Sequence, residues 1–228
     1  MLNIAHRGFT QKFPGNTMEA FEAAIGLGAD ALECDVQETA DGRFVVFHDE
    51  ELEGKRLGEL SASQVRGIRL EGGYRVPTLE EVLALCRHRI GMVLEVKRLR
   101  SLDGLVRILR AEANPEEVGL GSFDKGLMLE LSRLAPEFRR GVIVESPPEA
   151  PVALLKSCGC QVLGVPFPYA DEKLVKAIHQ AGCLVFLWGF REPGQIKGAL
   201  GLEIDGIVSD FPDVVKEELA TRGQGPVA

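Results

Sequence analysis

Two acidic side chains alternate within an apolar segment, Ala31-Leu32-Glu33-Cys34-Asp35-Val36. In an extended strand Glu33 and Asp35 share one face, whereas Cys34 points to the other. Neighbouring carboxylates in an apolar strand repel each other and lose hydration, so a cation or a shared proton must offset the repulsion. The pattern therefore predicts a metal site.

A third carboxylate, Glu95, lies in the apolar run Met92-Val93-Leu94-Glu95-Val96-Lys97. Three carboxylates form a hard oxygen set, which suits Mg²⁺ or Ca²⁺ better than zinc. Ordinary ion pairs are the alternative, with Glu95 beside Lys97 and Glu33 beside Arg7. Taken together, the three acids favour a site for one divalent cation.

Two histidines, His6 and His48, end apolar runs and are candidate catalysts, because imidazole moves protons near neutral pH. Chemistry on a leaving oxygen needs one proton donor and one acceptor, which a pair of histidines can supply. Arg7 and Lys97 are candidate phosphate ligands, with salt bridges to the acids as the alternative. Trp188, the only tryptophan, is a candidate wall of the substrate pocket or a packing residue at its mouth.

The elements that must position these residues alternate along the chain. Apolar segments separated mostly by helical patterns begin at Leu2, Ala31, Met92, Val118, Arg140, Val162, Cys183 and Gly206. This alternation predicts an α/β fold, a parallel (β/α)8 TIM barrel, with Phe44–His48 as an extra strand reached by a hairpin-like turn at Asp41-Gly42. A doubly wound open sheet is less favoured, because no glycine-rich dinucleotide fingerprint follows the first strand.

The unusual polar residues fall where such a barrel carries its active site, at the carboxyl ends of the strands. They are His6, Arg7, Glu33, Asp35, His48, Glu95, Lys97, Ser122, Glu145, Trp188 and Asp210. Asn16 or Thr17 is expected to cap the first helix, Thr78 and Glu81 form a capping-box pattern, and Asp210 is expected to cap the last helix.

The 228 residues fit a single domain over residues 1–228. Residues 49–76 are polar and glycine-rich, and we interpret them as a small lid inserted after the second strand, too short to own a core. The net charge of −8, without a basic cluster, argues against nucleic acid and against stable membrane association. No signal region or membrane-length apolar stretch is present, and the five cysteines fit buried free thiols, so a cytoplasmic location is expected.

The ordered set of motifs resembles the glycerophosphodiester phosphodiesterase family. The matching segments are His6-Arg7-Gly8, Asn16-Thr17, Glu33-x-Asp35, His48-Asp49, Pro77-Thr78-Leu79-Glu80-Glu81-Val82, Glu95-x-Lys97 and Asp205-Gly206-Ile207-x-x-Asp210. The resemblance implies a TIM-barrel enzyme that hydrolyses glycerophosphodiesters, small-molecule substrates, to sn-glycerol 3-phosphate and an alcohol. It also implies one divalent cation on Glu33, Asp35 and Glu95. His6 and His48 match the acid/base histidines, and Arg7 and Lys97 the phosphate-contacting cations.

The sequence departs from the family pattern at the mouth and the lid. Gly15 replaces the glutamate before Asn16, the Arg-Thr-Thr stretch after His48-Asp49 is absent, and Trp188-Gly189-Phe190-Arg191 replaces Trp-Thr-x-Asn. These departures concern substrate identity more than reaction type. Alternatives are a phospholipase of the sphingomyelinase D type, a catalytically silent barrel that binds a phosphorylated ligand, and a metal-dependent aldolase or isomerase using Lys97.

Overall fold

Eight parallel strands alternate with helices and close into a barrel in the computed structural model, which describes residues 1–97 and 99–223. Closure is explicit in the pairing, because the first strand is bonded in parallel to both the second and the last. The barrel strands are β1 (Leu2–His6), β2 (Ala31–Glu38), β6 (Gly91–Val96), β7 (Val118–Ser122), β8 (Arg139–Ile143), β9 (Val162–Pro166), β10 (Leu184–Trp188) and β11 (Gly206–Ser209). The predicted TIM barrel is confirmed.

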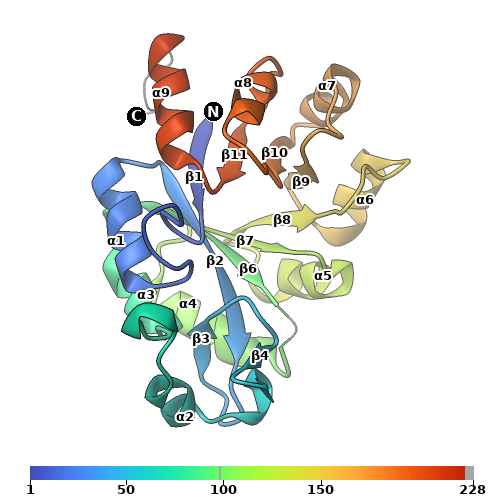
Figure 1. Cartoon of the computed structure of the whole chain (residues 1–228). Helices are drawn as coiled ribbons and strands as arrows, with labels where there is room; N and C mark the ends of the chain where they lie inside the picture. The colour runs from blue at the N-terminus through green and yellow to red at the C-terminus, as the bar shows by residue number, and fades with distance from the viewer. Residues whose placement is uncertain (98, 224–228) are drawn as a thin grey trace.

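Helices surround the strands, as Figure 1 shows. They are α1 (Met18–Leu27), α3 (Leu79–Cys86), α4 (Leu102–Glu112), α5 (Lys125–Leu134), α6 (Pro151–Cys158), α7 (Glu172–Gln180), α8 (Gly194–Ala199) and α9 (Pro212–Thr221). Thr78 and Glu81 form the expected capping box at the start of α3. The helix ends before the predicted Arg89, because the chain leaves helical geometry at Arg87 and turns left-handed at His88.

Strand register decides which side chains face the inside of the barrel. Asp35 on β2 is level with Glu95 on β6, and Glu33 is level with both Val93 on β6 and His6 on β1. Residues at the same level of neighbouring strands point to the same face. The acidic residues and His6 therefore face inward at the carboxyl end of the barrel.

The main hydrophobic core lies between the outer face of the strands and the helices. Leu32, Cys34 and Leu94 point outward and are completely buried, together with Leu79 of α3 and Leu105 of α4. Burial of this continuous apolar shell is the dominant favourable contribution to folding. The shell fixes the strands, and the strands in turn fix the side chains at their carboxyl ends.

The inserted segment follows β2, at the lower end of the molecule in Figure 1. Before it, β3 (Phe44–Val46) pairs antiparallel with the end of β2. Residues 49–76 themselves contain β4 (Glu51–Leu52), β5 (Lys55–Arg56), η1 (Leu57–Glu59), α2 (Ala62–Gly67) and η2 (Glu71–Gly73). The hairpin-like turn is thus present, but the strand ends at Val46, before His48. Leu57, Leu60 and Val65 of residues 49–76 form a small separate hydrophobic cluster with Val45 of β3.

All five cysteines are free thiols, four of them buried. In the part of the chain that the structure describes, every helix is too short or too polar to cross a membrane.

Candidate active site

Glu33, Asp35 and Glu95 converge at the carboxyl end of β2 and β6, as predicted from their spacing. Each offers one carboxylate oxygen, and the three oxygens lie within 4.8 Å of one another. Glu33 and Asp35 are buried, and Glu95 is partly exposed to the cavity above it. Three carboxylates at this separation form an oxygen donor set of the kind that hard divalent cations prefer.

The electrostatics of this cluster fit a cation. Burial, and then the charge of Asp35, raise the pKa of Glu33 to about 8. The Oε1 atom of Glu33 is buried and has no hydrogen-bond partner among the described residues. A buried carboxylate oxygen without a partner costs free energy that a bound cation would offset. The residues present therefore suit a divalent ion.

Asp35 is the acid that the protein's own cations neutralise. Lys97 Nζ lies 2.8 Å from Asp35 Oδ1 and also contacts Glu95, while Arg7 Nε lies 3.1 Å from Asp35 Oδ2. Burial alone would raise the pKa of Asp35, but Lys97 and Arg7 outweigh it and hold that pKa below its usual value. The expected pair of Glu95 with Lys97 is present. Arg7, however, gives its guanidinium to Asp35, and only its backbone N–H donates to Glu33 Oε2, at 3.2 Å.

A tight turn after β1 directs Arg7 into the site. Arg7 and Gly8 both have left-handed backbone angles, with φ of 56° and 87°. A Cβ atom on Gly8 would lie 2.6 Å from the backbone of Ala20 in α1, so only glycine allows this turn against the helix. The His6-Arg7-Gly8 motif is thus a structural requirement as well as a chemical one.

Asn16 binds Asp35 instead of capping α1. Its Nδ2 donates to Asp35 Oδ2 at 2.7 Å, and the hydroxyl of Thr17 accepts from the backbone N–H of Ala20 as the cap. Asn16 is buried and left-handed, with φ of 60°, a conformation that asparagine tolerates better than most residues. The alternative in which Thr17 caps the helix was therefore correct, and Asn16 belongs to the acidic site.

His6 is oriented by Asp210, which was expected only to cap the last helix. His6 Nδ1 lies 2.8 Å from Asp210 Oδ1, whose other partner is the hydroxyl of Thr10 at 3.0 Å. His6 Nε2 faces the cluster, 3.9 Å from Glu33 Oε2. Burial lowers the pKa of His6, but the hydrogen bond to Asp210 and the charge of Glu33 outweigh burial and raise it.

His48 lies in the segment after β3 and lines the same cavity as His6. Its Nδ1 is 2.7 Å from Asp49 Oδ1, and its side chain is exposed. The backbone on both sides is held by Gln37, whose Nε2 donates to the carbonyl oxygens of Phe47 and Asp49 at 2.7 and 2.8 Å. A buried side chain of β2 therefore fixes the position of this histidine.

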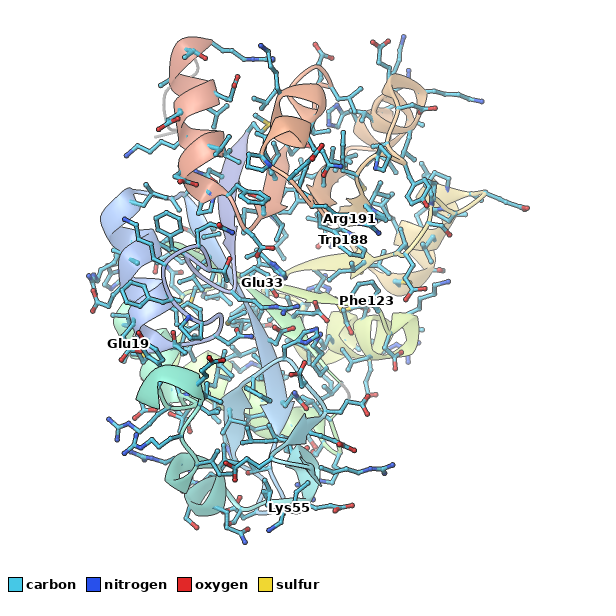
Figure 2. All side chains as sticks on the ribbon, viewed as in Figure 1. Glu19, Glu33, Lys55, Phe123, Trp188 and Arg191 are labelled. Carbon is cyan, nitrogen blue, oxygen red and sulfur yellow. The ribbon has the colours of Figure 1, made fainter. Side chains whose placement is uncertain are left out.

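Aromatic residues form one wall of the mouth. Trp188 ends β10 and lies edge-to-face with Phe123, with ring centroids 5.5 Å apart; Figure 2 shows the two side by side near Glu33. A single cavity of about 1250 Å³ contains this wall together with His6, Arg7, Glu33, His48, Glu95 and Lys97. Two expected members do not join the site. Ser122 donates to the carbonyl of Val96, and Glu145 is exposed and outside the cavity lining.

Sequence reasoning missed Asn16, Asp210 and Gln37 as supporting residues of the site. Gln37 continues the alternation of Glu33 and Asp35 on β2, so the sequence could have predicted that its side chain lies on the same face of the strand as theirs. Asp210 follows the last strand at the carboxyl end, where the sequence suggested only a helix cap. The partner of each residue comes from segments 10 to 204 positions away, and no local pattern identifies such partners.

A closed parallel barrel with an acidic cluster, cations and histidines at its carboxyl end defines an enzyme of the TIM-barrel class with a site suited to phosphate esters. The chain belongs to the glycerophosphoryl diester phosphodiesterase family, whose model matches residues 6–214. It is accordingly a hydrolase of phosphoric diesters.

Relatives agree with this assignment, and a solved structure shares the fold. A glycerophosphodiester phosphodiesterase of Bacillus altitudinis is 29% identical over 95% of this chain and 98% of its own length. One from Arabidopsis thaliana is 31% identical over 97% of this chain and 75% of its own length. The fold is shared with a phosphodiesterase of Oleispira antarctica, whose structure was solved with the product sn-glycerol-3-phosphate. The two structures match with a TM-score of 0.89 at 23% identity, and the match covers 95% of this chain and 96% of that one.

Proposed function

We propose that the chain hydrolyses glycerophosphodiesters to sn-glycerol 3-phosphate and an alcohol, with one divalent cation on Glu33, Asp35 and Glu95. The observation that supports this most directly is the meeting of three carboxylate oxygens within 4.8 Å, beside the oriented His6. The product bound in the Oleispira antarctica structure supports the same product here. Mg²⁺ and Ca²⁺ both suit the donor set, and a cation bound there would neutralise charge on the phosphoryl oxygens and orient the glycerol hydroxyls.

Arg7 and Lys97 supply positive charge for the substrate phosphate. Both pair with the buried Asp35, which fixes their positions at the rim of the acidic cluster. Arginine and lysine beside a phosphate stabilise the charge that builds up on its oxygens during displacement. Trp188 forms part of the wall against which the substrate rests.

The two histidines move the protons. One imidazole takes the proton of the attacking oxygen, either a glycerol hydroxyl, which gives a cyclic phosphodiester that water then opens, or water itself. The other imidazole donates a proton to the departing alcohol oxygen as its bond to phosphorus breaks. His6 and His48 each have a carboxylate at Nδ1, Asp210 and Asp49 respectively, which leaves Nε2 of each ring for the substrate.

The test is a product assay on glycerophosphocholine, glycerophosphoethanolamine and glycerophosphoinositol. The expected products are sn-glycerol 3-phosphate and the free alcohol. Release of glycerol with a phosphorylated alcohol would show that the other ester bond is cleaved and would overturn the proposal. His48→Ala should lower kcat at least 100-fold while the far-UV circular dichroism stays unchanged. His88→Ala, outside the cavity lining, is the matched control and should retain full activity.

A further inference from the structure

On the β6–β8 side, the inside of the barrel is more accessible than its outside, whereas the inward residues Ile4, Ala31, Val162 and Phe186 of other strands are buried and pack together. On β6 the inward residues Gly91, Val93 and Glu95 are half-buried, whereas the residues between them, which face the helices, are completely or almost completely buried. The interior of an eight-stranded barrel is normally filled by layers of bulky side chains. Here the accessible inner surface shows a lumen, the space enclosed by the inward faces of the strands.

Small residues line this lumen, and several of them are closely packed, because a Cβ atom at Gly91, Gly121 or Gly141 would meet a neighbour at 3.2–3.4 Å. Register places glycines at inward positions of five strands: Gly91, Gly119, Gly121, Gly141, Gly164 and Gly206. A Cβ atom at Gly119 would meet its nearest neighbours only at 3.8 and 3.9 Å, so the glycine is not demanded by close packing there. At Gly206, by contrast, a Cβ would lie 3.0 Å from the Phe186 ring, and this glycine admits the ring into the barrel.

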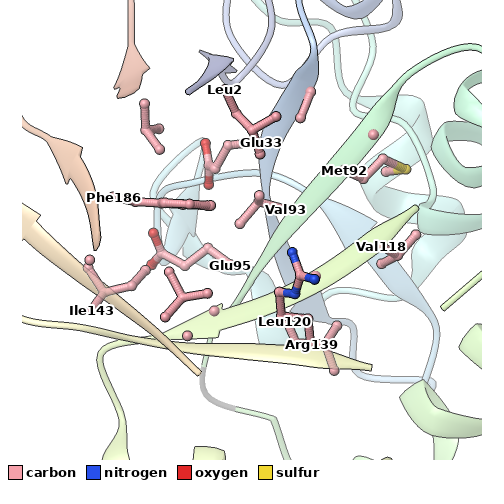
Figure 3. A pocket seen from close by; sticks show the side chains of 18 of the residues that line it. Leu2, Glu33, Met92, Val93, Glu95, Val118, Leu120, Arg139, Ile143 and Phe186 are labelled. Atoms are coloured by element: carbon pink, nitrogen blue, oxygen red, sulfur yellow. The ribbon is translucent and has the colours of Figure 1, made fainter. Parts of the chain in front are cut away.

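The middle of the lumen is apolar and is continuous with the candidate active site, and charged residues such as Glu117, Glu137 and Arg139 line its opposite end. Figure 3 shows Val93, Ile143 and Phe186 directed into the same space as Glu33 and Glu95. All of them line the one cavity of about 1250 Å³, which also reaches residues at the amino ends of the strands, such as Arg139. An apolar lining offers no partners for hydroxyl or charged groups, so a ligand part that enters it must be a hydrocarbon.

We propose that the lumen holds the hydrocarbon chain of a single-chain glycerophosphodiester, of the lysophospholipid type, whose phosphate lies at Arg7 and Lys97. This inference rests on the proposed function, because it takes the cationic end of the cavity as the phosphate site. Charge complementarity fixes the orientation: the anionic phosphate stays at the mouth, and the chain passes Val93 and Ile143 toward the amino ends of the strands. The lumen thereby selects substrates by chain length.

Binding of ethyl phosphate and n-octyl phosphate, measured by calorimetry, tests this independently of turnover. Each buried methylene contributes to affinity, so octyl phosphate should bind at least about tenfold more tightly than ethyl phosphate. Gly119→Leu fills the lumen and should abolish that difference, leaving the Kd of ethyl phosphate and the hydrolysis of glycerophosphocholine unchanged. Val93→Phe is a second filling variant from another strand, for use if Gly119→Leu does not fold.

Two results would overturn the inference. One is an equal Kd for the two phosphates in the unmodified protein. The other is a chain-length gain that survives Gly119→Leu and Val93→Phe but is lost in Phe123→Ala, which would place the chain against the exposed aromatic wall at the mouth. Failure of the proposed function is a separate outcome: glycerophosphocholine would then yield no sn-glycerol 3-phosphate, while the alkyl phosphate titrations would still decide where the chain binds.

Discussion

His6 is held in place by a carboxylate that comes from the opposite end of the chain. Asp210 and His6 are 204 positions apart, and their 2.8 Å contact exists only because β11 and β1 are neighbours in the closed barrel. The contact fixes the ring, leaves Nε2 directed at the acidic cluster, and contributes to the raised pKa of the imidazole. Asp210 therefore acts as a positioning residue for His6.

Replacing Asp210 should change the pH dependence as well as the rate. In Asp210→Asn the pKa of His6 falls, so the limb of the kcat profile that reports this histidine should move to lower pH, and kcat should fall about 10- to 100-fold with little change in KM. Thr10→Val removes only the second partner of Asp210 and should have a smaller effect. A lower rate with an unshifted pH profile would show a merely structural role for Asp210.

Glu33 should make the cation-free protein lose stability as pH rises. The pKa of Glu33 is raised to about 8 in the folded chain from an ordinary value of 4.5. The contribution of Glu33 to the free energy of unfolding is therefore fully present below pH 4.5 and is lost as pH rises through about 8. In EDTA, the free energy of unfolding of Glu33→Gln relative to that of the unmodified protein should therefore increase by on the order of 3 kcal/mol as the pH is raised from 5 to 9. Urea unfolding at the two pH values measures the difference. Glu19→Gln, on the exposed face of α1, is the control. The account would be contradicted if the free energies of unfolding of Glu33→Gln and the unmodified protein differed by the same amount at both pH values.

At the scale of elements, β2 carries more of the site than any other described strand. Its inward face presents Glu33 and Asp35 to the ion site, and two positions further Gln37 holds the segment that bears His48. The strand is eight residues long, and its last part pairs with β3 outside the barrel. One continuous strand thus sets the distance between the acidic cluster and the second histidine.

Removing the side-chain amide of Gln37 should loosen this link. Gln37→Leu leaves the carbonyl oxygens of Phe47 and Asp49 without their donor, which should destabilise the protein by about 1–3 kcal/mol. Because His48 is then less well fixed, kcat should fall about tenfold while the barrel stays folded. Kinetics and urea unfolding measure both effects, with the exposed Gln180→Leu as control. An unchanged kcat would remove Gln37 from the support of the site.

At the scale of the whole molecule, the alternation of apolar strands and helices was sufficient to predict the barrel, and alternation within strands was sufficient to predict the acidic cluster. The sequence did not reveal which residues from distant parts of the chain bind the side chains of the site. Asn16 and Asp210 both fit the local chemistry of helix caps, and only closure of the barrel brings them to Asp35 and His6. The hollow interior was missed for a similar reason, because single glycines such as Gly119 acquire a meaning only when register places them on one inner surface.

Cation dependence tests the central claim most directly. The chain is stripped with EDTA, and Mg²⁺ or Ca²⁺ is then titrated while calorimetry follows binding and a product assay follows glycerophosphocholine hydrolysis. The account predicts no turnover in the stripped chain, recovery that saturates at one ion per chain, and loss of both binding and recovery in Glu95→Gln. Full hydrolysis by the stripped chain, or undiminished ion binding without Glu95, would contradict it.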